Sequence, residues 1–256
     1  MKIMRVLADG APVWAIAEGE AAYRAEGDIW GAPTKGARLG DLDALKALTP
    51  VSPHNKVLVV LSNWNKREDR GGPGFLIKPL NSRINPGEVI VYPEIAAEVW
   101  IEAELAIVIG KTCRNVSVEA ARDHIRGYTV SNDVTAAKWK KTTGFDMFTG
   151  KGFDTFCVLG PCIETDLDPT NATLRGFIDG EQFFEKNTGL MLWNAYELVA
   201  WISQVMTLDP GDVISCGACT ETRERHMAPG QVVGVAIDGV GRFDNPVVAE
   251  RDLMRG

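Results

Sequence analysis

The chain contains 256 residues, of which 45% are hydrophobic and 24% are charged, and its formal net charge is −7 at pH 7. This composition is ordinary for a globular protein, and the length allows one large domain or a small domain joined to a larger one. The negative charge argues against nucleic-acid and anionic-membrane partners. Because the sequence has neither a signal-peptide pattern nor a long apolar run, we expect a cytoplasmic protein with no membrane partner.

Short β-like runs dominate the first fifty residues, and Asp9-Gly10 between two of them is typical of a hairpin turn. We therefore expect residues 1–52 to form a small N-terminal β module. A short linker leads from it to a larger body over residues 55–256, which begins with the continuous apolar run of a buried strand.

Helices are expected to be few. Ser117 has the position of an N-cap for a helix ending near Ile125, and Asn194 caps an amphipathic helix over residues 196–206. The polar stretch over residues 138–150 is expected to be a surface or interface loop.

The segment EAELAIVIG, residues 102–110, predicts a central strand because it is apolar and rich in β-branched residues. Side chains two residues apart on a strand point to the same face, so Glu102 and Glu104 are expected to lie side by side. Two adjacent carboxylates repel each other, which indicates that a positive group lies between them. A divalent metal satisfies that requirement, whereas a solvated strand edge is the simpler alternative.

A second β-rich run, GYTVSNDVTA, delivers Asp133 directly after its apolar part. Carboxylates without a neighbouring histidine or cysteine form a hard oxygen site. Such a site favours Mg²⁺ or Mn²⁺, with Ca²⁺ as a further alternative, over zinc or copper.

The five cysteines are scattered through the chain and are expected to be reduced thiols. Cys216 and Cys219 have the spacing of a redox or zinc half-site. No second pair completes a zinc site, and the surrounding sequence does not resemble a thioredoxin.

Six segments in order resemble the fumarylacetoacetate hydrolase family over about residues 55–248: EAELAIVIG, GYTVSNDVTA, KGFDTF with a following LGP, KNTGLM, TLDPGDVIS and GQVVGVAIDGVGRFDNPV. The resemblance implies an α+β, predominantly β fold of the family's type, a mixed β-sandwich roll with few helices. It also implies a homodimer, a divalent metal on an acidic triad, and chemistry on 2-oxo or β-diketo acids.

The resemblance assigns roles to particular residues. Lys151 would face the metal and neutralise charge that develops on a substrate oxygen, although a salt bridge to Asp154 is the structural alternative. Thr188 would touch the substrate. The candidate metal ligands are Glu102, Glu104 and Asp133; the candidate catalytic residues are Lys151, Arg67 and Glu102; the candidate substrate-binding residues are Lys78, Arg70, Thr188 and Asp154.

The sequence departs from the family pattern at two places. The His–Glu pair that activates water in hydrolytic members falls on Arg67 and Arg70, which suit the binding of a substrate carboxylate instead. Lys78 is either a second carboxylate-binding cation or part of a structural ion pair. The usual Thr-Gly-Thr-Pro of the pocket is replaced by Cys-Gly-Ala-Cys at residues 216–219, and His226 nearby is the remaining candidate base.

We therefore expect a divalent-metal-dependent enzyme that cleaves a C–C bond of a 2-oxo or β-diketo acid, as a hydrolase or lyase, through a metal-stabilised enolate. Because the His–Glu pair is missing, a 2-oxo acid decarboxylase or an enol–keto isomerase is the alternative. A catalytically inactive metal-binding member of the family is the third hypothesis.

Overall fold

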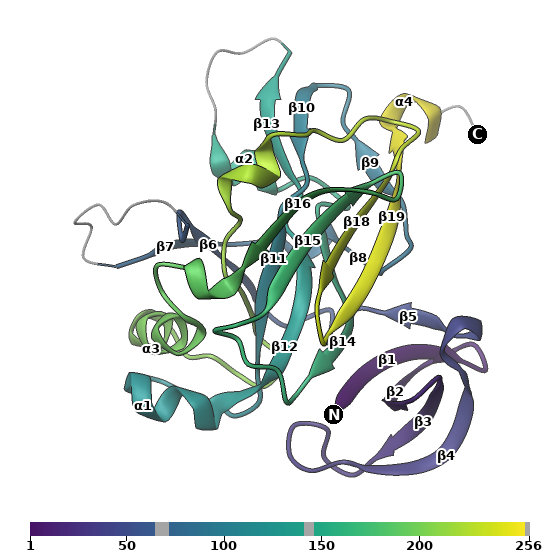
Figure 1. The fold of residues 1–256 in the computed structure, drawn as a ribbon, viewed down its shortest axis with the longest axis vertical. Coiled ribbons are helices and arrows are strands. Elements are labelled where there is room, and N and C mark those ends of the chain that lie inside the picture. Colours follow the sequence, from purple (N-terminus) through teal and green to yellow (C-terminus); the bar gives the residue numbers. More distant parts are fainter. Residues whose placement is uncertain (65–71, 141–145, 254–256) are drawn as a thin grey trace.

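The computed structural model describes residues 1–64, 72–140 and 146–253. Within these residues the protein is predominantly β, with one twelve-stranded, one five-stranded and one two-stranded sheet. Figure 1 shows the five-stranded sheet stacked on the middle of the large sheet, with a few short helices around the edges. The predicted α+β class with mixed sheets and few helices is therefore confirmed.

The large sheet has the order β4-β3-β2-β1-β14-β12-β11-β17-β6-β7, with β5 beside β1 and β8 beside β14. It is mixed, since β17 pairs with β6 and β14 with β8 in parallel, whereas the other pairs are antiparallel. Its strands are β1 (Lys2–Ala8), β2 (Ala11–Glu18), β3 (Ala21–Glu26), β4 (Thr34–Asp41), β5 (Lys46–Leu48), β6 (Val57–Leu61), β7 (Gly74–Ile77), β8 (Arg83–Ile84), β11 (Ala103–Ile109), β12 (Ile125–Asn132), β14 (Cys157–Glu164) and β17 (Val213–Ser215).

The five-stranded sheet has the order β16-β15-β18-β19-β9, and the two-stranded sheet pairs β10 with β13. The strands are β9 (Ile90–Tyr92), β10 (Ala96–Trp100), β13 (Thr135–Trp139), β15 (Thr173–Ile178), β16 (Glu181–Asn187), β18 (Val232–Ile237) and β19 (Gly241–Ala249). The turn between β15 and β16 has Asp179 and Gly180 at φ of 51° and 83°, the left-handed conformation that the Asp-Gly sequence predicts.

The main core lies between the two stacked sheets and beneath helix α3. Leu105 and Ile107 of β11 belong to this core, whereas Ala106 and Val108 point to a second cluster on the other face of the large sheet. All seven residues of β11 are buried, because β12 and β17 flank it and other elements cover both faces. The predicted central strand with alternating faces is thus confirmed, and Glu104 lies on the same face as Ala106.

The α-helices of the described residues are α1 (Val118–Ala121), α2 (Met147–Lys151), α3 (Ala195–Val205) and α4 (Glu250–Leu253). Short 3-10 turns span Leu42–Ala44, Leu80–Ser82, Arg122–His124, Thr188–Leu190 and Thr220–Arg223. Asn194 forms a reciprocal capping box with Glu197 at the start of α3, as its sequence position predicts. Ser117 caps α1, but the α-helix is shorter than expected because the chain tightens into a 3-10 turn after Ala121.

The stretch over residues 138–150 was expected to be a loop, and that prediction is wrong at both ends. Lys138 and Trp139 belong to β13, where Lys138 pairs with Glu98 of β10, and α2 begins at Met147. Asp146 caps α2 by accepting backbone hydrogen bonds, which explains why a helix forms in a polar segment. No described helix is both long and apolar enough to cross a membrane.

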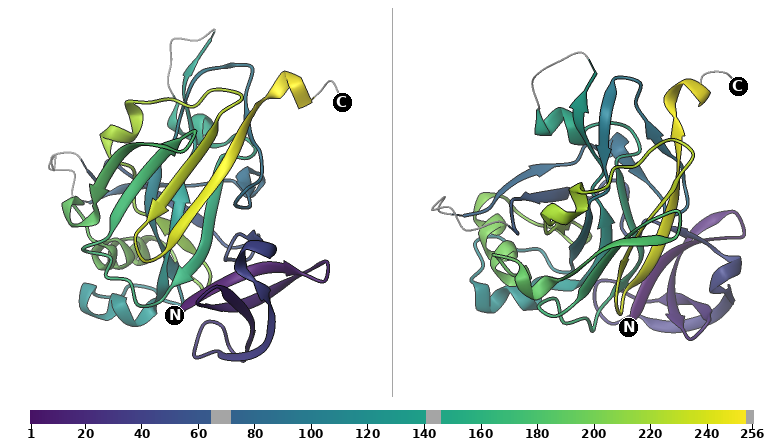
Figure 2. Two further views of the ribbon diagram at one scale, coloured as in Figure 1. Left: turned by 45° about the vertical axis from the view of Figure 1, so that its right-hand side comes forward. Right: turned by 45° about the horizontal axis from the view of Figure 1, so that its top comes forward.

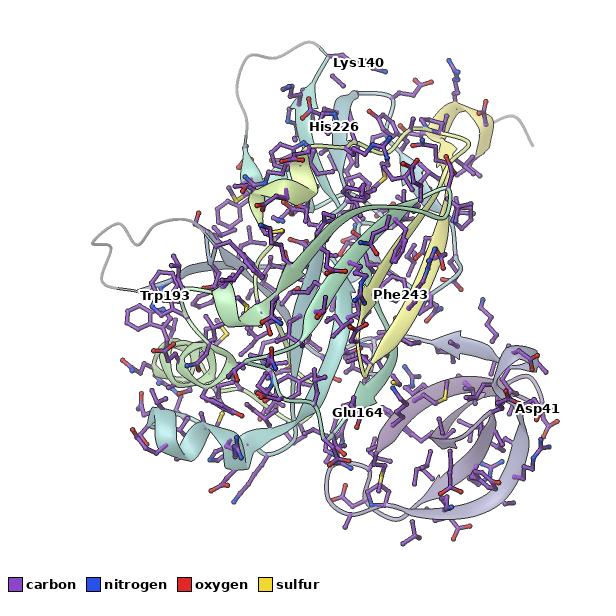
Figure 3. The ribbon with its side chains drawn as sticks, viewed as in Figure 1. Asp41, Lys140, Glu164, Trp193, His226 and Phe243 are labelled. Atoms are coloured by element: carbon purple, nitrogen blue, oxygen red, sulfur yellow. The ribbon has the colours of Figure 1, made fainter. Side chains whose placement is uncertain are left out.

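The N-terminal strands β1 to β5 curl into a compact unit that Figure 1 shows at the side of the larger body, and Figure 2 shows the same separation from two further directions. The unit is joined to the body by backbone pairing, because Lys2 and Ile3 of β1 lie opposite Glu164 and Ile163 of β14. Glu164 is labelled at this junction in Figure 3. The large sheet therefore runs without a break from the module into the body.

Candidate metal centre

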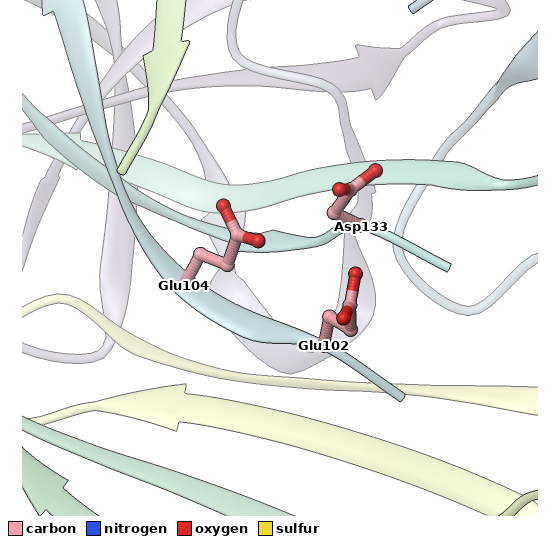
Figure 4. A group of neighbouring side chains, drawn as sticks. All are labelled: Glu102, Glu104 and Asp133. Carbon is pink, nitrogen blue, oxygen red and sulfur yellow. The ribbon is translucent and has the colours of Figure 1, made fainter. Parts of the chain in front are cut away.

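Three buried carboxylates meet where β11 begins and β12 ends. These two strands are antiparallel, with Ala103 opposite Asn132, so Glu102 and Asp133 are the next residues on either side of that pair. The Asp133 backbone N–H donates to the Glu102 carbonyl oxygen over 2.9 Å. Glu104 follows on the same face of β11, and Figure 4 shows the three side chains gathered, with Glu102 pointing toward Asp133.

Each of Glu102, Glu104 and Asp133, hereafter the acidic triad, offers one carboxylate oxygen within 4.8 Å of the other two. All three residues are at most 2% exposed. Uncompensated carboxylates at this depth would be strongly destabilising, so the surroundings have to supply positive charge.

Two lysines supply much of that charge. Lys151, at the end of α2, places its ammonium 2.7 Å from Glu102 Oε2 and in direct contact with Asp133 Oδ2. Lys78, directly after β7, lies 2.9 Å from Asp133 Oδ1 and donates to the Val134 carbonyl oxygen over 3.2 Å. Both lysines are buried, so they are held at the triad by packing as well as by charge.

A third cation approaches from the segment after β17. Arg223 Nε lies 3.5 Å from Glu102 Oε1, and its guanidinium carbon lies 4.6 Å from the centre of the Trp100 ring. The Arg223 side chain is 39% exposed, in contrast to the two lysines.

Neutral donors fix the orientation of the glutamates. Glu104 Oε2 accepts from the Ser215 hydroxyl over 2.5 Å and from the Gly217 backbone N–H over 2.8 Å. Gly217 has a φ of +89°, and a Cβ there would lie 2.7 Å from the Val60 carbonyl oxygen, so only glycine fits. Glu102 Oε2 accepts from the Thr135 hydroxyl over 2.8 Å.

The electrostatic setting separates the pKa values of the titratable groups. Burial, reinforced by the charge of Asp133, raises the pKa of Glu104 to about 8. Burial would also raise the pKa of Asp133, but Lys151 and Lys78 outweigh it and leave that pKa below its ordinary value. Burial lowers the pKa of Lys151, yet Asp133 and the two glutamates reverse the effect, so its ammonium keeps its proton.

The acidic triad fits a hard divalent cation. Its donors are all carboxylate oxygens, the donor type that Mg²⁺, Mn²⁺ and Ca²⁺ prefer. Among the described residues, no hydrogen-bond donor is aligned with Asp133 Oδ1, although that atom is fully buried beside the Lys78 charge. The hydrogen bonds that described residues make to Glu104 go to Oε2, so Oε1 is available as a ligand atom.

The structure brings together most, but not all, of the residues predicted for the site. Lys78 forms the buried ion pair that the sequence left as one of two alternatives, whereas Lys151 pairs with Glu102 and Asp133 and not with Asp154. Asp154 is exposed and accepts from the Asn81 side chain over 2.5 Å.

Thr188 is buried, and its hydroxyl oxygen accepts from the Ala172 backbone N–H over 2.9 Å. The roles of Thr188 and Asp154 in substrate binding stay predictions. Arg67 and Arg70 lie outside the described residues, and their roles stay predictions as well.

None of the three histidines of the chain makes a contact with the acidic triad in the structure. His124 Nδ1 lies 3.3 Å from the Lys111 carbonyl oxygen, and the His54 backbone N–H donates to Ser52. His226 Nε2 lies 3.1 Å from Glu98 Oε1, and Figure 3 labels it on the side of the body that carries α2 and β13. Glu98 therefore serves as a partner of His226 and Lys138.

The cysteine pair of residues 216–219 is buried, and all five cysteines are free. Burial raises the pKa of Cys216 well above its ordinary value and that of Cys219 to about 11. Because the thiolate is the reactive form, these thiols are poor redox groups, and their segment serves instead to present the Gly217 N–H to Glu104.

Sequence reasoning missed Thr135, Ser215 and Arg223. Thr135 follows Asp133 at a spacing of two, and Ser215 ends the segment TLDPGDVIS of the family resemblance, so the positions of both gave a weak signal. Arg223 lies in an irregular segment with several other charges, and only its contacts with Glu102 and Trp100 single it out.

The stacked mixed sheets and the buried carboxylates beside a lysine define a β-rich protein with an acidic triad that could hold a hard cation. The family model of the fumarylacetoacetate (FAA) hydrolase C-terminal domain matches residues 54–248, and the chain belongs to this family.

An oxaloacetate tautomerase, fahd2, of Xenopus laevis mitochondria is 41% identical over 185 residues, which are 69% of this chain and 58% of that protein. The chain thus spans little more than half the length of that relative. The crystal structure of a 5-carboxymethyl-2-hydroxymuconate delta-isomerase from Mycobacterium smegmatis matches with a TM-score of 0.88 and 33% identity, covering 98% of this chain and 100% of the other.

A maleylpyruvate hydrolase from Sphingobium sp. SYK-6, solved with manganese(II) and pyruvate, matches with a TM-score of 0.79 and 27% identity over 97% of this chain and 99% of the other. The named relatives are therefore enzymes of three reaction types within one family.

Proposed function

We propose that the protein is a divalent-metal-dependent enzyme that interconverts the keto and enol forms of a 2-oxo acid. The observation that carries the proposal is the acidic triad, which is buried, brings three carboxylates within 4.8 Å and is contacted by a lysine that keeps its charge. This combination suits a reaction in which negative charge develops on an oxygen of the substrate.

Glu102, Glu104 and Asp133 would hold Mg²⁺ or Mn²⁺, with Ca²⁺ as a further alternative, and the ion would supply Lewis-acid stabilisation of that charge. Glu104 is positioned for this task by Ser215 and Gly217, and Asp133 by its place at the end of β12. The manganese in the related maleylpyruvate hydrolase supports the same choice of ion.

Lys151 would act as a fixed cation. Its ammonium is held by Glu102, Asp133 and the Thr135 hydroxyl, so its direction is set before any substrate arrives. Because its pKa is raised, it keeps its positive charge, which stabilises a developing oxyanion, and it does not remove a proton.

The named relatives favour proton transfer at C3 over hydrolysis, because the tautomerase and the isomerase are 41% and 33% identical to this chain. Both reactions need a base, which accepts a proton from C3 in one case and from water in the other. Each histidine of the chain has its contacts away from the acidic triad, so the histidines do not distinguish the two reactions.

The second candidate is C–C bond cleavage by a hydrolase or lyase, the reaction first expected from the sequence. The maleylpyruvate hydrolase with bound pyruvate supports it, because cleavage and tautomerisation share an enolate. Decarboxylation of a 2-oxo acid shares the enolate too. These reactions differ in the bond that breaks at C3, so they are distinguished by their products.

The remaining expectations are proposals with separate support. A homodimer is supported by large apolar side chains on the surface, among them Leu80, Phe148 and Leu190. A cytoplasmic location is supported by the five free cysteines. A boundary between a module of residues 1–52 and a catalytic body of residues 55–256 is supported by the family match, which begins at residue 54.

The test uses oxaloacetate and acetylpyruvate with chelator-treated protein, before and after Mg²⁺ or Mn²⁺ is added. Faster metal-dependent change of the oxaloacetate enol absorbance without pyruvate formation supports tautomerisation. Pyruvate from oxaloacetate indicates decarboxylation, and pyruvate with acetate from acetylpyruvate indicates cleavage. The rates are compared with those of an unrelated control protein treated in parallel. If the protein accelerates the reaction of neither acid with either metal, the proposed function is wrong.

A further inference from the structure

We propose that Arg223 binds a second carboxylate of the substrate and so restricts the enzyme to 2-oxo dicarboxylic acids. This inference rests on the proposed function, because it concerns the substrate of the same site. It is carried by the position of Arg223 beside Glu102, by its stacking on Trp100 and by the charge balance of the centre.

The first step is the placement of the guanidinium. Arg223 approaches Glu102 Oε1 through Nε alone, at 3.5 Å, among the residues that the structure describes. Its guanidinium carbon lies over the Trp100 ring, 4.6 Å from the ring centre, so the ring supports the guanidinium. The two terminal nitrogens are therefore available for a ligand, and their parallel N–H groups match a carboxylate.

The second step is that the segment carrying Arg223 is anchored on both sides. Before it, Lys186 lies 2.7 Å from Glu221, and the Thr222 hydroxyl donates to the Cys219 carbonyl oxygen over 2.8 Å. After it, the Met227 backbone N–H donates to the Val99 carbonyl oxygen over 3.1 Å. Arg223 is thus presented by a fixed backbone, which reduces the entropy lost when a ligand binds.

The third step is the charge of the centre. The three carboxylates of the acidic triad face three cations in the described part of the chain, namely Lys78, Lys151 and Arg223. These groups balance one another when all are ionised. A divalent cation then adds two positive charges, which a substrate with two carboxylates compensates and a monocarboxylate does not.

The fourth step is exposure. Lys78 and Lys151 are buried behind the carboxylates, whereas the Arg223 side chain is 39% exposed. It therefore lies toward the solvent side of the acidic triad, where the end of a substrate that projects from the ion would lie. Arg223 is a specificity-determining residue in this arrangement, and Trp100 positions it.

The experiment measures binding of 2-oxoglutarate and 2-oxopentanoate by calorimetry in the presence of Mn²⁺. These acids have the same chain length and differ by a terminal carboxylate in place of a methyl group. Arg223→Gln is expected to lower the affinity for 2-oxoglutarate by about 10- to 100-fold and the affinity for 2-oxopentanoate by less than about threefold. Arg223→Lys keeps the charge but loses the two parallel N–H groups. Its affinity for 2-oxoglutarate is expected to lie between those of the unmodified protein and Arg223→Gln.

Arg225→Gln is the matched control, since Arg225 lies two residues away and is placed near Glu181. Mn²⁺ affinity without acid is measured for each variant, because loss of the Arg223 charge beside Glu102 also changes metal binding. Such a change affects both acids equally and cancels in their ratio.

If Arg223→Gln lowers the affinities for both acids equally, or lowers neither, the inference is overturned. Arg223 is then a counter-ion of Glu102. If the unmodified protein binds neither acid, the inference fails, whereas the proposed function is decided separately by the experiment with oxaloacetate and acetylpyruvate. If the protein binds both acids and Arg223→Gln does not discriminate between them, the inference fails while the proposed function stands.

Discussion

The ammonium of Lys151 lies 2.7 Å from the carboxylate of Glu102, and both side chains are almost completely buried. The same ammonium contacts Asp133, so one lysine joins the residue before β11 to the residue after β12. Removing it leaves two buried carboxylates without their nearest cation, and both the fold and the proposed chemistry depend on that contact.

Lys151→Met is therefore expected to destabilise the metal-free protein by about 3–5 kcal/mol. It should also lower kcat by roughly 100- to 1000-fold, as expected for removal of a preorganised group that stabilises an oxyanion. Chemical denaturation measures the first effect and steady-state kinetics the second. Mn²⁺ should recover part of the lost stability, because the ion replaces the missing positive charge.

Lys138→Met is the control for that variant, since the Lys138 side chain is 68% exposed and its partner Glu98 is outside the acidic triad. It should change stability by less than about 1 kcal/mol. If both variants have the same stability and kcat, Lys151 has no role at the centre.

Glu104→Gln tests the metal site with the least disturbance of the fold. The amide keeps an oxygen that accepts from Ser215 and Gly217, and no lysine loses its partner. Loss of a residue that only supports a metal ligand lowers affinity by roughly 10- to 100-fold. Loss of a ligand atom from Glu104 should lower Mn²⁺ affinity by at least as much. Titration of Mn²⁺ by calorimetry measures the change, with Glu98→Gln as the control carboxylate. Unchanged affinity in Glu104→Gln would show that Glu104 is not a ligand.

The raised pKa of Glu104, about 8, predicts a pH dependence of metal binding. Below that pKa the carboxyl group must lose a proton before it can bind the ion, so Mn²⁺ affinity should rise with pH up to about 8 and then level off. Competition with a chelator of known pH behaviour measures this profile. Affinity independent of pH between about 6 and 8 would contradict the predicted proton release.

The same shift predicts the pH dependence of folding in the absence of metal. The folded protein holds the Glu104 proton more tightly than the unfolded chain, where the pKa returns to its ordinary value of 4.5. The contribution of this group to stability therefore falls as pH rises from about 4.5 to about 8, and is constant above that range. Glu104→Gln should remove this slope, which denaturation at several pH values in the presence of a chelator would measure.

Asn63 ties the segment before α3 to the segment beside Glu104. Its side chain donates to the carbonyl oxygens of Trp193 and Cys216 over 3.1 and 2.8 Å, and it accepts from the Trp193 N–H over 2.9 Å. Trp193 lies beside α3 in Figure 3.

Asn63→Ala should lower the free energy of unfolding by about 1–3 kcal/mol, because buried backbone groups lose their partners. Because Cys216 precedes the Gly217 donor, Mn²⁺ affinity should fall as well. Asn171→Ala on the surface serves as the control, and equal stability of the two variants would contradict the structural role of Asn63.

The strand that carries Glu104 could be predicted from its own residues, because alternation and β-branching act within one element. The meeting of Asp133 with Glu102 depends on how β11 and β12 pair, which local pattern does not specify, and only the family resemblance supplied it. For the same reason the sequence could not decide whether Lys78 binds a substrate carboxylate or forms a structural ion pair. Its partner Asp133 lies far away along the chain, and a local sequence pattern does not predict that contact.

Arg223 shows the limit of the sequence most clearly. Its neighbours are charged and its backbone is irregular, so no periodicity marks it, and its role depends on a contact with Trp100 from another segment. The segment over residues 138–150 was misread because its polarity hid a strand that pairs with β10 and a helix capped by Asp146.

The pairing of β1 with β14 connects the N-terminal module to the strand that precedes Asp133. Val158 at the opposite end of β14 lies opposite Asn132, the residue before Asp133. A single strand therefore touches the N-terminal module at one end and the neighbour of a metal-ligand candidate at the other. We therefore expect substitutions among the first residues of the chain to affect the proposed ion site from a distance, through the hydrogen-bonded backbone of β14 and β12.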